Sequence, residues 1–133
     1  MLFRSAAFVE AHRTDPKTVI IDARDADYYT GTKTGGSPTA PHLTGHIAGA
    51  QSLPYGSTVT ANSTFKSDEE LRALFDAAGV KPGDTVVAYC HIGQQATTVI
   101  FAGRTLGLDV KLYDGSFEEW SKKNGAVEKT IIK

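Results

Sequence analysis

The chain has little cysteine, little excess charge of either sign and no long apolar run. Its one cysteine, Cys90, excludes an intramolecular disulfide and a zinc site built on several cysteines. Its 14 basic and 15 acidic side chains give a net charge of −1, so a basic surface for nucleic acid or for anionic lipid is not expected. No stretch approaches the roughly 18 apolar residues of a membrane span. A cytoplasmic location is expected, or a periplasmic one if a signal peptide has been removed.

What remains is the composition of an ordinary globular protein. The 133 residues are 41% hydrophobic and 22% charged, which supplies enough apolar side chains for one packed core. Since an average domain has roughly 150 residues, we expect one domain over residues 1–133.

Apolar residues along the chain follow the strand period in some segments and the helix period in others. The predicted strands, rich in β-branched residues, are 18–23, 85–89 and 110–113, with a short extended piece at 51–53. The predicted helices, of which Ser5 caps the first and Ser67 the second, are 6–13, 68–78, 97–106 and 117–123. This alternation predicts an α/β fold with a central parallel β-sheet flanked by helices on both faces.

Two segments fall outside that alternation. Residues 31–45 contain four glycines and two prolines, which predicts a surface loop. The charged tail, residues 122–133, is expected to be a solvated end. Its last three residues, 131–133, fit either an added strand or a frayed end.

One candidate nucleophile directly follows a predicted strand. Cys90 comes after the strand 85–89 and before a short loop with Gly93 and then a helix. Ligands of open parallel sheets bind beyond the carboxyl ends of the strands. Loop amides and a helix N-terminus can converge there on an anion, which favours the nucleophilic thiolate of Cys90. A lone cysteine is also often a small buried apolar residue, so the position by itself leaves both interpretations open.

Four segments in order, across residues 18–124, resemble the rhodanese-like sulfurtransferases. They are Asp22-Ala23-Arg24, GHIAGA at 45–50, CHIGQQ at 90–95 and YDGSFEEW at 113–120. The likeness is greatest to the second, catalytic domain of tandem rhodaneses. The chain would then be either a lone domain or one excised from a tandem pair.

The resemblance implies sulfur transfer without a metal or an organic cofactor. Cys90 would take a sulfur from thiosulfate or 3-mercaptopyruvate as a persulfide, and pass it to cyanide, a thiol or a thioredoxin-like acceptor. The implied substrate-binding positions, whose amides would hold the persulfide, are His91, Ile92, Gly93, Gln94, Gln95 and Ala96. Asp22, Arg24 and His46 are implied to be structural.

The donor-binding positions depart from the family pattern. Thiosulfate-using members often carry basic residues just after the cysteine, where this chain has His91 and Ile92, and a donor-binding arginine is replaced by Tyr28. The choice between the two donors therefore stays open. Lys33, His42 and His91 are candidates to replace the missing cation.

Two other functions fit part of the sequence. A non-catalytic binding or sulfur-carrier module of the same fold would explain the missing cation, although such modules usually lack the cysteine. A Cys-x5-Arg phosphatase is disfavoured because position 96 is alanine and the next arginine is Arg104. His42 and His46 are four residues apart, but they stand in a Gly/Pro-rich loop without acidic partners, which disfavours a metal site.

Overall fold

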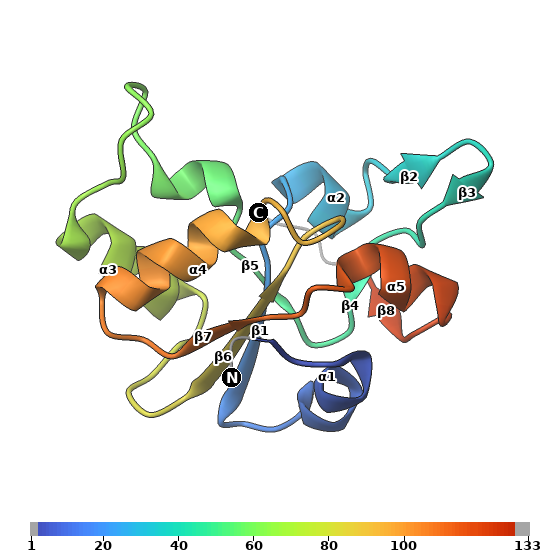
Figure 1. The fold of residues 1–133 in the computed structure, drawn as a ribbon, viewed down its shortest axis with the longest axis horizontal. Helices are drawn as coiled ribbons and strands as arrows, with labels where there is room; N and C mark the ends of the chain where they lie inside the picture. The colour runs from blue at the N-terminus through green and yellow to red at the C-terminus, as the bar shows by residue number, and fades with distance from the viewer. Residues whose placement is uncertain (1–2, 130–133) are drawn as a thin grey trace.

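A parallel sheet of four strands, in the order β5–β1–β6–β7, organises the computed structural model, which describes residues 3–129 (Figure 1). Its strands are β1 (Thr18–Asp22), β5 (Gln51–Ser52), β6 (Thr85–Tyr89) and β7 (Val110–Leu112). The predicted strands are confirmed to within one residue at each end, and the extended piece at 51–53 is the edge strand. Asp22 pairs with Tyr89 in register, so β1 and β6 end at the same level.

Four of the helices lie close to the predicted ranges, whereas two were not predicted. The four are α1 (Ala6–His12), α3 (Asp68–Ala77), α4 (Ala96–Thr105) and α5 (Ser116–Lys122), and the other two are α2 (Ala26–Thr30) and the 3₁₀ helix η1 (Tyr55–Thr58). The Ser5 and Ser67 hydroxyls accept hydrogen bonds from the amides of Phe8 and Glu70, which confirms both predicted caps. None of the helices in residues 3–129 has the length and apolar character needed to cross a membrane.

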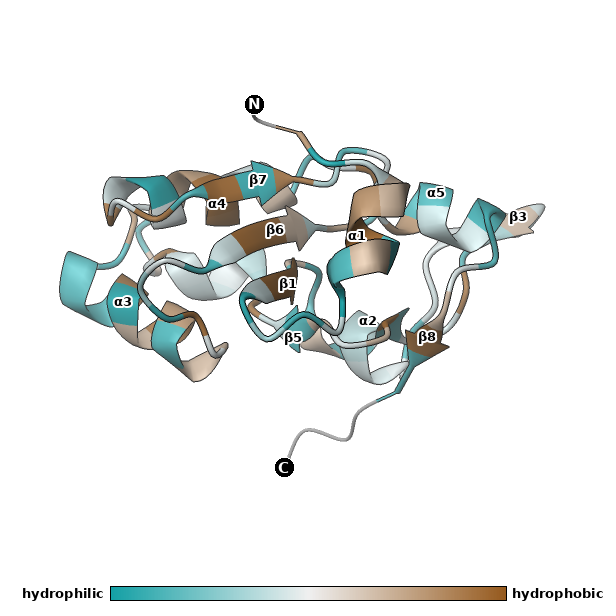
Figure 2. Cartoon of the chain, turned by 90° about the horizontal axis from the view of Figure 1, so that it is seen from below, coloured by the Kyte–Doolittle hydropathy of each residue, from teal (hydrophilic) through white to brown (hydrophobic). Residues whose placement is uncertain are grey.

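Helices cover both faces of the sheet, with α3 and α4 on one side and α1 and α5 on the other (Figure 2). Strand β6 supplies both cores because its side chains alternate. Val86 and Ala88 pack in the cluster under α3 and α4, whereas Val87 and Tyr89 pack in the cluster under α1 and α5. The predicted α/β fold, with a parallel sheet between two helical layers, is confirmed.

Two small antiparallel pairs lie outside this sheet. The predicted loop 31–45 contains a hairpin of β2 (Gly36–Ser37) and β3 (Ala40–Pro41). Further on, β4 (His46–Ile47) pairs with β8 (Val127–Glu128).

The prediction of a solvated tail is therefore wrong for residues 127–128. The Glu128 carboxylate accepts a hydrogen bond from the Gly49 amide at 2.8 Å, and Val127 pairs with Ile47. A pairing two residues long leaves no periodic pattern in the sequence, which explains the error. Residues 131–133, whose conformation the sequence left open, lie outside the described residues.

Candidate active site

Cys90 follows β6 at the carboxyl end of the sheet, and its side chain is completely buried. Its Sγ accepts a hydrogen bond from the Gly93 amide at 3.1 Å. Gly93 has φ +98°, and a Cβ added there would lie 3.0 Å from the carbonyl oxygen of Asp114. The turn that points this amide at the sulfur thus depends on glycine. A donor in this position stabilises negative charge on the sulfur.

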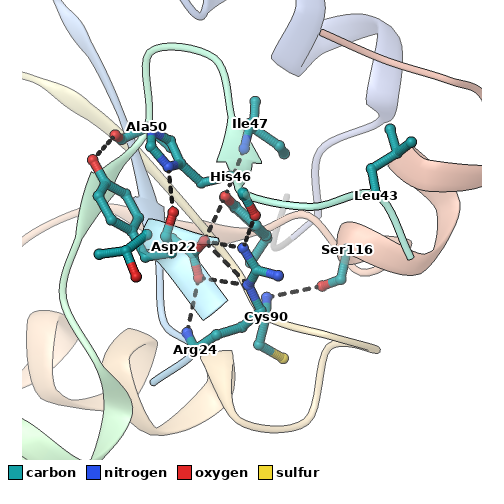
Figure 3. A network of polar contacts seen from close by, with 12 residues as sticks. Asp22, Arg24, Leu43, His46, Ile47, Ala50, Cys90 and Ser116 are labelled. Atoms are coloured by element: carbon teal, nitrogen blue, oxygen red, sulfur yellow. Dashed lines mark hydrogen bonds and ion pairs between the residues drawn. The ribbon is translucent and has the colours of Figure 1, made fainter. Parts of the chain in front are cut away.

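The start of α5 holds the first residues of the loop through the backbone. The Cys90 carbonyl accepts from the Phe117 amide at 2.9 Å, and the His91 carbonyl accepts from the Glu118 amide at 3.0 Å. In Figure 3, the Cys90 amide donates in turn to Ser116 Oγ, at 3.2 Å. Ser116 is buried and has φ +54°, a left-handed conformation that is rare for serine. The position of Cys90 is therefore set by main-chain contacts and one buried hydroxyl.

The six predicted substrate-binding positions differ in their surroundings. Within the described part of the chain, the Gly93 amide is the one that contacts the sulfur. Ile92 and Gln94 are exposed, and Ala96 is buried as the first residue of α4. Gln95 Oε1 is buried and has no hydrogen-bond partner among residues 3–129. An unpaired buried acceptor is unfavourable, so this oxygen is available to a ligand.

Two imidazoles and a phenol from separate segments meet beside the loop. The His91 and Tyr28 rings meet edge to face, with 4.5 Å between centroids, and the centroid of the His42 ring is 6.0 Å from that of His91. Gly35 packs against both histidines: a Cβ built on it would lie 2.9 Å from His91 Nδ1 and 3.2 Å from His42 Nδ1. In the described residues, His42 Nδ1 is buried without a hydrogen-bond partner. Lys33, the other candidate cation, is largely exposed and pairs with Asp27 at 3.6 Å.

Burial sets the protonation of these histidines. It is the main reason that the pKa of both His42 and His91 is lowered from the ordinary value. Both rings are therefore neutral at pH 7, and each offers one N–H donor and one nitrogen acceptor.

The end of β1, next to this loop, holds a buried ion pair (Figure 3). Arg24 Nη2 lies 2.6 Å from Asp22 Oδ2 and also donates to the Gly45 carbonyl at 2.6 Å. The Tyr89 hydroxyl donates to the same carboxylate at 2.8 Å, and burial raises the pKa of this phenol well above its ordinary value. The Arg24 guanidinium lies over the Phe117 ring, 4.1 Å from its centroid. These contacts tie β1 to the segment before β4 and to α5.

His46, the third residue with an implied structural role, is also buried. Its Nδ1 is 2.7 Å from the Tyr29 carbonyl oxygen, and its ring stacks on the Tyr29 ring at 3.7 Å. Its Nε2 lies 3.3 Å from Glu128. His42 and His46 thus have different neighbours. No group of three or more histidine, cysteine or acidic side chains in the described residues is arranged to hold a metal ion.

Sequence reasoning did not single out Ser116 or Gly35 as parts of this site. Ser116 lies inside the YDGSFEEW segment, so its place in a recognisable motif was the available signal. Gly35 is one of several glycines in a loop, and its contact with two histidines depends on how that loop folds back.

Comparison with known proteins gives one consistent family. Residues 5–123 match the family model described as a rhodanese-like domain. The chain is 36% identical over 115 residues to the sulfur carrier protein TtuD of Thermus thermophilus, covering 82% of this chain and 40% of that protein. It is 35% identical over 132 residues to a Haloferax volcanii protein named "Putative thiosulfate sulfurtransferase", covering 91% of this chain and 46% of that protein.

A solved structure is similar to this chain over most of its length. The crystal structure of the Tum1 protein from Saccharomyces cerevisiae matches with a TM-score of 0.81 at 25% identity, over 96% of this chain and 46% of that one. The chain therefore spans less than half the length of each of these three proteins.

Proposed function

Because the chain belongs to the rhodanese-like domain family, we propose that it transfers a sulfur atom through a persulfide on Cys90. The observation that carries the proposal is the Gly93 amide, which donates to Cys90 Sγ at the carboxyl end of the sheet. Relatives named for sulfur transfer or sulfur carriage support the same chemistry.

The reaction has two displacement steps. The Cys90 thiolate attacks the outer sulfur of the donor, so that a new S–S bond forms while the donor's own bond to that sulfur breaks. Sulfite leaves from thiosulfate, or pyruvate leaves from 3-mercaptopyruvate after its carbon gains a proton. A cyanide, a thiol or a thioredoxin-like acceptor then attacks the terminal sulfur, and the thiolate is regenerated.

Each part of the loop has a role in this scheme. The amides of residues 91–96 hold the anionic persulfide, beginning with the one from Gly93 that already reaches the sulfur. Asp22, Arg24 and His46 act structurally, because their polar groups are engaged with buried neighbours. The scheme uses no metal and no organic cofactor.

Access to the sulfur is part of the mechanism. Cys90 has no exposed surface, so part of the surrounding chain has to move before a donor can reach Sγ. Main-chain contacts hold the start of the loop at Cys90 and His91, whereas Ile92 and Gln94 are exposed. We assign the movement to the part of the loop beyond His91.

The test is the intact mass of the protein after incubation with thiosulfate and, separately, with 3-mercaptopyruvate. The wild type is expected to gain one sulfur atom and to lose it on addition of cyanide, whereas Cys90→Ser gains none. The donor that loads faster identifies the donor class. If neither donor loads the wild type, the proposed transfer from small-molecule donors is wrong.

The second candidate function, a sulfur carrier, is favoured by the name of the Thermus thermophilus relative. Turnover separates the two. An enzyme forms many equivalents of thiocyanate from excess donor and cyanide, whereas a carrier loaded by a partner protein releases one equivalent per chain.

A further inference from the structure

We propose that a cavity at the amino end of β6 binds a small molecule with an apolar body and a carboxylate group. The cavity has a volume of about 290 Å³, at the small end of the range typical of ligand sites. Its wall is formed by the C-terminal half of α3, by the segment 80–83 before β6 and by the turn after α4. Cys90 follows the other end of β6 (Figure 1), and none of the described residues 90–95 lines the cavity. The site is therefore separate from the candidate active site.

The floor of the cavity is apolar and already packed. Phe75 and Val80 are buried members of the core under α3 and α4, and the half-buried Leu108 packs against that core. Gly103 allows the Phe75 ring to reach α4, because a Cβ at Gly103 would lie 3.1 Å from the end of the ring. The aromatic part of the floor is therefore held in place by the fold. A preformed apolar floor favours a ligand with an apolar body, since its transfer out of water is favourable.

Two glycine turns leave the mouth of the cavity open. Gly83 and Gly107 both line it, and their φ angles are +85° and +82°. A Cβ built on either glycine would meet no atom of a non-adjacent described residue within 4 Å. The left-handed backbone favours glycine at both positions, and the lack of a side chain there leaves the entrance clear for a ligand.

The rim of the cavity is charged, with basic side chains in excess. Arg72 and Lys81 lie there with one acidic residue, Asp76, and all three are exposed. Neither basic side chain forms an ion pair within residues 3–129. Two cations against one carboxylate favour an anionic ligand. A guanidinium also binds a carboxylate through two parallel hydrogen bonds, which suits Arg72 to this role.

Backbone carbonyls at the cavity are already paired. Both α3 and α4 end beside it, and the free carbonyls of a helix end would attract a cation. The Phe75 carbonyl accepts from the Val80 amide, and the Gly103 carbonyl accepts from the Leu108 amide, each at 3.0 Å. These bonds reduce that attraction, so the side chains of the rim select the charge of the ligand.

A titration of the full chain with four probes tests the assignment. Phenylacetate carries both the apolar body and the carboxylate, whereas acetate has only the charge, 2-phenylethanol has only the body, and 2-phenylethylamine has the opposite charge. Phenylacetate is expected to bind with a dissociation constant of about 1 mM or lower, and each other probe at least about tenfold more weakly. Backbone amide NMR shifts measure the four affinities. The saturable shifts are expected within residues 72–83 and 107–108.

Substitutions at the rim separate this site from the rest of the surface. The double variant Arg72→Gln/Lys81→Gln is expected to bind phenylacetate at least about tenfold more weakly than the wild type. Both side chains are exposed, so the variant should fold normally, which its circular dichroism checks. The matched control is Lys123→Gln, because Lys123 is an exposed lysine that borders a different cavity beside α1. This control is expected to bind as the wild type does.

Three outcomes would each overturn the inference. They are similar affinities for all four probes, shifts centred outside the two segments that line the cavity, and an unchanged affinity in the double variant. Cys90→Ser is expected to bind phenylacetate as the wild type does, because the cavity lies at the opposite end of β6. The binding site can therefore be confirmed or refuted whether or not Cys90 transfers sulfur.

Discussion

The ends of β1 and β6 lie side by side in the sheet, yet their polar groups are arranged in opposite ways. After β1, buried charges are matched: the Asp22 carboxylate accepts from the Arg24 guanidinium and from the Tyr89 hydroxyl. After β6, Cys90 Sγ has one amide donor, and Gln95 Oε1 nearby has no hydrogen-bond partner within residues 3–129. A satisfied network stabilises the fold, whereas an unsatisfied one keeps its polar atoms available to a ligand.

The largest expected effect comes from breaking the buried ion pair at the end of β1. Replacing Arg24 with methionine leaves Asp22 buried and uncompensated, and is expected to lower the free energy of unfolding by about 3–5 kcal/mol. Cys90→Ser places a hydroxyl at a completely buried position and is expected to cost about 1–2 kcal/mol, less than the loss of Arg24, while abolishing sulfur transfer. Urea denaturation followed by circular dichroism measures both. Similar losses of stability in the two variants would remove the contrast between the two strand ends.

Substitutions of Ser116 test the buried hydrogen bond that its hydroxyl accepts from the Cys90 amide. Ser116→Ala removes the acceptor of the Cys90 amide and is expected to destabilise the protein by about 1–3 kcal/mol, because that amide is buried. Ser116→Gly removes the same hydroxyl but relieves the strain at φ +54°, so its loss should be smaller by about 1 kcal/mol. Chemical denaturation ranks the two, and a glycine variant less stable than the alanine variant would contradict the assigned strain.

Gly93 tests the amide that points at the sulfur. Gly93→Ala and Gly83→Ala both place alanine at a positive φ, at a shared backbone cost of about 1–2 kcal/mol. At Gly93 the new Cβ also meets the Asp114 carbonyl oxygen at 3.0 Å, whereas at Gly83 it meets nothing within 4 Å.

Persulfide formation separates these two variants. Gly93→Ala is expected to slow it at least about tenfold, because losing one charge-stabilising donor costs more than about 1.4 kcal/mol, and Gly83→Ala leaves it unchanged. The rate is measured by the intact mass of samples quenched at successive times after addition of thiosulfate. Equal rates would show that the Gly93 amide does not assist the thiolate.

The smallest expected effect concerns Glu128, which supports the segment that accepts the Arg24 guanidinium. The Gly49 amide holds the pKa of this carboxylate below its ordinary value of 4.5. Its stabilisation is therefore present above pH 4.5 and is lost as the pH falls through the lower, folded-state pKa.

Because Glu128 is half exposed, Glu128→Gln is expected to cost less than about 1 kcal/mol at pH 7. The wild type and the variant should converge as the pH falls below the folded-state pKa of Glu128, where the carboxylate becomes protonated. Urea denaturation at a series of pH values, from pH 7 downward, measures the difference. A gap that persists in acid would assign the effect to packing instead of charge.

The parts of the fold that the sequence predicts are those with a repeating local pattern. β6 and α3 each have enough residues for the apolar period to be read, and Ser67 marks where α3 begins. The short elements α2, η1 and the pair β4–β8 have two to five residues each, and no period can be recognised over that length. Their formation depends on tertiary contacts, such as that between Gly49 and Glu128.

In the candidate site, too, the part with a local sequence pattern could be predicted and the part that depends on tertiary contacts could not. Cys90 could be located because it directly follows a predicted strand, and the pattern of parallel sheets places it at the ligand-binding edge. The approach of His42 to His91 could not be predicted, since it depends on a glycine-rich loop folding back over α5. Of the three candidates to replace the missing cation, Lys33 lies at the surface in an ion pair with Asp27, whereas the rings of His42 and His91 lie 6.0 Å apart.

The backbone anchoring of the loop after β6 has an evolutionary consequence. Phe117 and Glu118 bind the main-chain carbonyls of Cys90 and His91, so the position of these two residues does not depend on the side chains of Ile92 and Gln94, which face solvent. Substitutions at Ile92 and Gln94 can accumulate with little penalty to folding. Descendants of such a chain can therefore vary the exposed part of the loop while keeping the position of Cys90 unchanged.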